Sequence, residues 1–133
     1  MNKIKIGIIY GGQSEEHEVS LQSAENVINA IDQGKYDVVK IFVGKDGKLE
    51  NGESIAKLAE HDLYVAFPLT HGPYGEDGSL QGMLKMLGIP FVGSSVTGSA
   101  VGMDKDIMKR LLRDADLPIG KFIAIRDKSD IDF

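Results

Sequence analysis

A short run of β-branched apolar residues at 3–9 ends on the pair Gly11-Gly12, and an acidic segment follows directly. The continuous apolar character of this run is typical of a parallel strand that is buried on both faces. Ser14 and three glutamates then form a helix-start pattern, and apolar residues at helical spacing continue from 21 to 31. The opening of the chain therefore predicts a strand, a glycine turn and a helix.

The same alternation continues along the chain. We expect further strands at 36–43, 63–69, 91–93 and 121–125, hairpin turns at 45–47 and 51–52, and helices at 55–58, 80–87 and 103–115. Strands that alternate with helices predict an α/β domain with a mostly parallel sheet and helices on both faces. We interpret 1–94 as one compact domain and 95–133 as a connector that leads into a larger unit.

Charge and composition exclude several classes of function. A net charge of -5 argues against a general binder of nucleic acid or of acidic membrane surfaces, because phosphate groups would repel such a protein. The absence of cysteine excludes disulfides, thiolate metal sites and cysteine chemistry. No apolar run approaches the roughly 20 residues that a membrane helix needs, and no signal peptide is recognisable. We therefore expect a cytoplasmic protein that does not contact a membrane.

Two glycine-rich loops leave predicted strands and enter predicted helices, at 10–18 (the first loop) and at 70–78 (the second loop). Ligands of open parallel sheets bind beyond the carboxyl ends of the strands. A helix N-terminus favours an anion, whereas the carboxylates of these loops favour a cation. The pattern therefore predicts a small polar ligand, for example an amino acid.

Residue patterns alone leave ordinary structural roles open. The glutamates at 15, 16 and 18 are also favourable first-turn charges of a helix. His17 fits a structural or surface role, whereas His71 fits a structural and a functional role equally well. Lys105 begins an amphipathic helix, where a lysine is usually solvated.

Four motifs in order resemble the D-alanine–D-alanine ligase family. Tyr-Gly-Gly-Gln-Ser-Glu-Glu-His-Glu-Val-Ser (10–20) is similar to the N-terminal signature of that family, and His-Gly-Pro-Tyr-Gly-Glu-Asp-Gly-Ser-Leu-Gln-Gly (71–82) is similar to its most diagnostic motif. Ile-Pro-Phe-Val-Gly-Ser (89–94) and Met-Asp-Lys (103–105) follow. The resemblance extends over essentially the whole chain. Some members carry a longer insertion between the second and third strands, where residues 44–61 are short in this sequence.

The resemblance implies a Rossmann-like (pre-ATP-grasp) fold and an ATP-grasp ligase. In that reaction ATP phosphorylates the carboxylate of one D-alanine, and the amine of a second D-alanine attacks the acyl phosphate. The product, D-alanyl-D-alanine, enters peptidoglycan and so serves cell-wall biogenesis and cell shape. Mg²⁺ neutralises phosphate charge. The resemblance also implies a homodimer, with D-alanine and ATP as small-molecule partners.

Site residues carry over by motif position. Glu16 matches the glutamate that holds the ammonium of the first D-alanine, and His71 matches the histidine near that substrate and the acyl phosphate; both are the candidate catalytic residues. Val19 matches an apolar wall near the substrate methyl group. The resemblance gives the remaining roles as follows: Gly72 touches substrate, Ser20, Glu76 and Asp77 support the site, and Lys105 contacts ATP phosphate.

Other expectations concern what lies beyond this sequence. The resemblance implies that most of the ATP-grasp portion, including the Mg²⁺ ligands, lies outside these 133 residues, so we expect no catalysis by the chain alone. The alternatives are a D-alanine–D-lactate or D-alanine–D-serine ligase, and a non-catalytic amino-acid-binding module. A flavodoxin-like receiver domain is disfavoured, because Gly11-Gly12 and Thr70-His71 occupy the places of its acidic residues.

Overall fold

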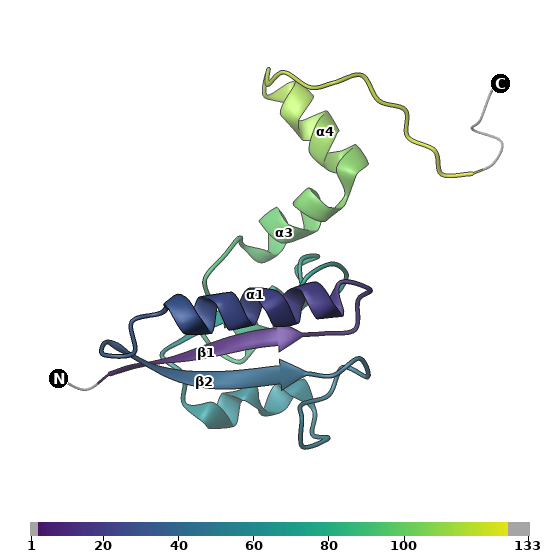
Figure 1. The fold of residues 1–133 in the computed structure, drawn as a ribbon. Coiled ribbons are helices and arrows are strands. Elements are labelled where there is room, and N and C mark those ends of the chain that lie inside the picture. Colours follow the sequence, from purple (N-terminus) through teal and green to yellow (C-terminus); the bar gives the residue numbers. More distant parts are fainter. Residues whose placement is uncertain (1–2, 128–133) are drawn as a thin grey trace.

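The computed structural model describes residues 3–127, and its sheet has three parallel strands in the order β2-β1-β3 (Figure 1). These strands are β1 (Ile4–Gly11), β2 (Tyr36–Val43) and β3 (Val65–Pro68). The central strand pairs on both sides, and Ile9 lies opposite Ile41 of β2 and Pro68 of β3. The apolar runs of the sequence therefore form the predicted α/β sheet, and the bounds of β2 are those expected.

Helices cover both faces of the sheet, as the sequence predicts. On one face, Leu58 of the 3₁₀ helix η1 (Ile55–His61) and Leu84 of α2 (Ser79–Met86) are fully buried against Ile9. Ile8 points to the opposite face, because successive strand side chains alternate. That face is covered by α1 (His17–Ala30), which lies along β1 in Figure 1. The two apolar layers hold the ends of β1 and β3 in fixed positions.

The segment between β2 and η1 forms the predicted turns. Antiparallel bridges join Val43 to Leu49 and Lys48 to Ser54. Gly47 and Gly52 have positive φ angles of 76° and 80°, which glycine adopts without steric cost. This compact hairpin lies directly beyond the end of β2.

The helix expected at 103–115 is confirmed to within two residues at each end, but the sequence does not predict the second helix that precedes it. Two helices occupy this region, α3 (Val96–Met103) and α4 (Lys105–Asp114), and Asp104 separates them. The Asp104 side chain accepts hydrogen bonds from the backbone N–H groups of Asp106 and Ile107, both at 3.0 Å, and so caps α4. The apolar periodicity reflects α4 alone, since α3 contains small residues and glycines and has no strong apolar stripe.

The two short strands expected at 91–93 and 121–125 are wrong. Phe91 forms a single parallel bridge with Ala66, and no ladder continues from it. Residues 121–125 run beside α4 without strand pairing: Lys109 Nζ lies 5.1 Å from the Phe122 ring centroid, and Arg126 forms an ion pair of 2.7 Å with Asp106. A strand needs a partner edge, and α4 offers none. The rest of the expected exit, 128–133, lies outside the described residues.

None of the helices within 3–127 has the length and apolar character that a membrane crossing requires. In Figure 1, α3 and α4 extend away from the sheet, and the following segment runs onward from α4.

Candidate active site

The first and second loops meet at the carboxyl ends of β1 and β3, as predicted. The Ser14 hydroxyl donates a hydrogen bond of 2.7 Å to the backbone carbonyl of His71. A Cβ atom placed on Gly72 would lie only 2.8 Å from Glu16 Oε2. The loops therefore touch each other, and Glu16 and His71 lie on adjoining parts of one surface.

Ser20 joins the two strand ends beneath this surface. It is completely buried, its Oγ accepts a hydrogen bond of 2.8 Å from the Gly11 N–H, and its hydroxyl donates to the Leu69 carbonyl at 2.6 Å. Gly11 ends β1, and Leu69 follows β3. One hydroxyl thus satisfies two backbone groups that neither strand pairs, and it sets the spacing of the two loops.

Glu16 occupies the N-cap position of α1, but its side chain makes no capping hydrogen bond. Glu18, which is the first-turn acid, instead lies 3.6 Å from Lys45 in an exposed ion pair. The Glu16 carboxylate is exposed, and one turn along the helix Val19 is 54% exposed. A carboxylate beside an exposed apolar side chain suits an ammonium group that is next to a methyl group.

His71 is placed between α1 and its own loop. Its Nε2 lies 3.1 Å from the Ser23 hydroxyl, and its Nδ1 lies 4.0 Å from Glu76 Oε1. The second carboxylate oxygen of Glu76 accepts a hydrogen bond of 2.9 Å from the Gly72 N–H. Glu76 therefore contacts the loop backbone and faces the ring. Ser23 did not emerge from the sequence, because a serine within a helix carries no local signal of a distant partner.

Asp77 shapes the end of the second loop. Its carboxylate accepts hydrogen bonds of 2.9 Å from the backbone N–H groups of Tyr74 and Ser79. Burial acts to raise the pKa of Asp77, but these hydrogen bonds outweigh it and leave the pKa below its ordinary value. The ionised carboxylate thus holds Tyr74 at its positive φ of 67° and begins α2.

Lys105 is the first residue of α4 and is exposed, so it points away from the core, as expected. Its ammonium group donates a hydrogen bond of 2.7 Å to the Gly102 carbonyl. A polar cleft between α3 and the second loop is lined by Lys105, Glu76 and Gln81. Within 3–127 no group of three or more His, Cys, Asp or Glu side chains is arranged to hold a metal ion.

His17 has a structural place. It is 5% exposed, and its Nδ1–H donates to the Gly12 carbonyl at 2.6 Å. Its ring lies edge-on to Phe42, with centroids 5.7 Å apart. His17 thereby fastens the first loop to β2, and the structural role considered from the sequence is confirmed.

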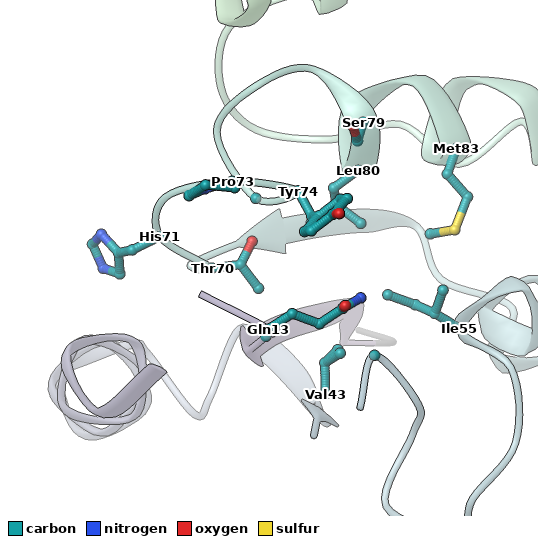
Figure 2. A pocket seen from close by; sticks show the side chains of 13 residues that line it. Gln13, Val43, Ile55, Thr70, His71, Pro73, Tyr74, Ser79, Leu80 and Met83 are labelled. Carbon is teal, nitrogen blue, oxygen red and sulfur yellow. The ribbon is translucent and has the colours of Figure 1, made fainter. Parts of the chain in front are cut away.

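A cavity of about 190 Å³ lies on the sheet side of the second loop, with walls from Val43, Ile55, Leu80 and Met83. His71 is at its edge, but Figure 2 shows the imidazole pointing away from the other labelled side chains. Glu16 and Val19 do not line this cavity. The cavity therefore includes His71 but neither Glu16 nor Val19, which are exposed at the start of α1.

Comparison with known proteins identifies the family. The family described as "D-ala D-ala ligase N-terminus" matches residues 5–62 and 48–94. The D-alanine–D-alanine ligase of Oceanobacillus iheyensis is 46% identical, over 98% of this chain and 46% of the relative. D-alanine–D-alanine ligase A of Escherichia coli K12 is 44% identical, over 94% of this chain and 44% of the relative. The chain thus spans a little under half the length of these relatives.

The alignments also locate a difference in length. The alignment with the Oceanobacillus protein extends over 169 positions, more than the 133 residues of this chain, so the relative has residues without a counterpart here. The two family matches overlap at 48–62. This overlap lies between β2 and β3, in the region where the sequence is expected to be short relative to some members.

Solved structures agree in fold. The D-alanine–D-alanine ligase of Coxiella burnetii has a TM-score of 0.83 at 33% identity, over 97% of this chain and 47% of that structure. The VanG D-Ala:D-Ser ligase of Enterococcus faecalis has a TM-score of 0.77 at 32% identity, over 90% and 44%. From its sequence matches and its fold alike, the chain belongs to the D-alanine–D-alanine ligase family, whose N-terminal domain it contains.

Proposed function

We propose that this chain supplies the binding surface for the first D-alanine of an ATP-dependent D-alanine–D-alanine ligase. The observation that carries the proposal is the meeting of Glu16 and His71 at one edge of the sheet, through the contact of Ser14 with His71 and of Gly72 with Glu16. We assign 1–94 to substrate binding and 95–133 to the connection with the nucleotide-binding part of the enzyme.

Each group of this surface suits one part of D-alanine. The Glu16 carboxylate accepts charge-assisted hydrogen bonds from the ammonium group. Val19, one turn along α1, packs against the methyl group. His71 faces the carboxylate end of the substrate, while Gly72 allows that group to approach the backbone closely. Ser20, Glu76 and Asp77 act on these residues through the hydrogen bonds described above.

Lys105 is the residue that would hold a phosphate of ATP. Its ammonium group is exposed beside the polar cleft and makes its hydrogen bond to a backbone carbonyl, and among residues 3–127 it has no acidic partner that a phosphate would have to displace. ATP, when bound with Mg²⁺, supplies the phosphoryl group that activates the substrate carboxylate. Within 3–127 the carboxylates are not grouped as a metal site, and we assign to this surface the binding and orientation of D-alanine.

Titration of the isotope-labelled chain with D-alanine and with L-alanine tests the proposal. We expect D-alanine to shift the amide signals of the two loops and of the start of α1, because a rigid surface with separate places for ammonium, methyl and carboxylate discriminates between enantiomers. NMR detects such binding at millimolar affinity. Equal responses to the two enantiomers, or none to either, would contradict the proposal.

A D-alanine–D-serine ligase is the second candidate, and the fold similarity to the VanG D-Ala:D-Ser ligase favours it over a D-lactate ligase. Both ligases take D-alanine first, so the surface described here serves either one. We further propose that the enzyme works in the cytoplasm as a homodimer; the exposed apolar side chains of Leu117, Ile123 and Ile125 support self-association.

A further inference from the structure

Ser23 contacts the candidate site from within α1. The helix turns this half-buried residue towards the second loop, and its Oγ lies 3.1 Å from His71 Nε2. A hydroxyl either donates to a ring nitrogen or accepts from one, so the distance alone does not decide where the imidazole proton lies. The other ring nitrogen decides it.

His71 Nδ1 faces a carboxylate. Glu76 Oε1 lies 4.0 Å away, and the carboxylate is held there because Oε2 accepts the hydrogen bond from Gly72. An ionised carboxylate only accepts hydrogen bonds, and its negative charge favours a proton on the nearer ring nitrogen. In a neutral ring with its proton on Nδ1, Nε2 carries the lone pair, and the Ser23 hydroxyl then donates to it.

We propose that Ser23 is a positioning residue that fixes His71 as the Nδ1–H tautomer. The separation of 4.0 Å between Nδ1 and Glu76 is longer than a hydrogen bond, so the Nδ1–H group retains capacity to donate. The hydrogen-bond acceptor for this Nδ1–H group is an oxygen that enters beside Glu76. Within the proposed function, that oxygen belongs to the carboxylate of the first D-alanine. His71 then acts as a hydrogen-bond donor to the substrate, and Ser23 acts through His71.

The chain contains its own reference signals for this assignment. It has three histidines, at 17, 61 and 71. His17 donates from Nδ1 to the Gly12 carbonyl, so its signals are the reference for the Nδ1–H tautomer. His61 is exposed, so its signals are the reference for a ring that exchanges between both tautomers in water. Long-range ¹H–¹⁵N spectra of the imidazole rings distinguish a protonated nitrogen from one with a lone pair. We choose about pH 8, where a histidine in water is mostly neutral.

In the unmodified chain we expect His71 to match His17, with a protonated Nδ1 and a lone pair on Nε2. Ser23→Ala should shift the His71 signals towards those of His61, and Ser23→Thr, which keeps the hydroxyl, should restore them. Gln22→Ala, at the exposed neighbouring position of α1, is the matched control and should leave all three rings unchanged. A role in packing alone would alter stability without altering the tautomer.

A protonated Nε2 in the unmodified chain would overturn the proposal without any variant, and so would a His71 tautomer that Ser23→Ala leaves unaltered. Addition of D-alanine tests the link to the proposed function separately. We expect D-alanine to perturb His71 Nδ1 more than Nε2. If D-alanine perturbs no ring signal, the proposed function fails while the tautomer assignment stands.

Discussion

The hydroxyl of Ser14 donates a hydrogen bond to the backbone carbonyl of His71, across 57 residues of sequence. The same oxygen accepts a hydrogen bond of 3.2 Å from the Glu16 N–H. Ser14 thus links the residue proposed to hold the substrate ammonium with the residue proposed to face its carboxylate. Within the proposed function, we expect this link to set the distance between these two groups and therefore the size of amino acid that fits.

Ser14→Ala should lower the free energy of unfolding by about 1 kcal/mol, the usual net worth of one hydrogen bond. Its larger effect should be local, because the His71 carbonyl loses its tie to the first loop. We expect faster amide hydrogen exchange at 71–78 than in the unmodified chain. Ser94→Ala, at an exposed serine, is the control. Unchanged exchange in the second loop would show that the link is not needed there.

Glu16→Gln should weaken D-alanine binding without harming the fold, because the exposed carboxylate fills no core volume. A charge-assisted hydrogen bond is worth about 1.5–3 kcal/mol, which corresponds to roughly a 10- to 150-fold loss of affinity. Titration with D-alanine measures the loss, and thermal unfolding checks stability. Glu15→Gln is the matched control. Lowered thermal stability with unchanged affinity for D-alanine would show that Glu16 acts only as a favourable charge at the start of α1.

Gly72→Ala should disturb the site more than its backbone strain explains. An added Cβ at this position would meet Glu16 Oε2 at 2.8 Å, and the φ of +68° alone disfavours alanine by about 1–2 kcal/mol. Gly88→Ala isolates the strain, since Gly88 has a φ of +71° and open space around its Cβ position. We expect similar losses of stability from both variants, but loss of D-alanine binding only from Gly72→Ala.

Asp77 makes the second loop sensitive to acid. Its pKa lies below its ordinary value in the folded chain, so its contribution to stability is present above the pKa of the unfolded chain and is lost as the pH falls through the lower folded value. Asp77→Asn should therefore destabilise by about 1–2 kcal/mol near pH 7, and the difference should shrink below about pH 4. Urea unfolding across this range measures it. Asp37→Asn, at an exposed position of β2, should show no comparable trend.

Ile123→Lys should reduce self-association. Ile123 is 82% exposed within an apolar segment that leaves α4, and such side chains favour association in water. Sedimentation velocity over a range of concentrations measures the effect. Val92→Lys, at a half-exposed apolar residue elsewhere, is the control. A chain that is monomeric before substitution would contradict a dimer formed through this segment.

Periodicity predicted the parts of the fold that bury apolar surface. The apolar runs in β1 and β2 and the stripe at Leu80, Met83 and Leu84 are recognisable in the sequence because their apolar side chains pack in the core. Periodicity does not predict α3, since this helix is rich in small residues and contributes little to a periodic pattern. Asp104, the capping residue directly before α4, is the sequence signal that places the start of this helix.

The candidate site, like the fold, was predictable only in part. Glu16 and His71 were recognisable because they belong to contiguous motifs, but what holds them did not follow from those motifs. Ser14, Ser23 and the cleft beside Gln81 depend on contacts between segments far apart in sequence. Only the packing of α1 and the second loop on one sheet brings those side chains together.

Any rotation of α4 relative to α3 would occur at a single residue, Asp104. The two helices are joined there by a single extended residue, with φ -83° and ψ 98°. Because α4 has 10 residues and is about 15 Å long, a turn of 10° at Asp104 carries its far end by roughly 3 Å. Lys105, one residue beyond Asp104, hardly moves. A rotation at Asp104 would therefore move whatever follows Asp114 towards or away from the sheet, whereas the ammonium group of Lys105 would stay at the cleft that it lines together with Glu76.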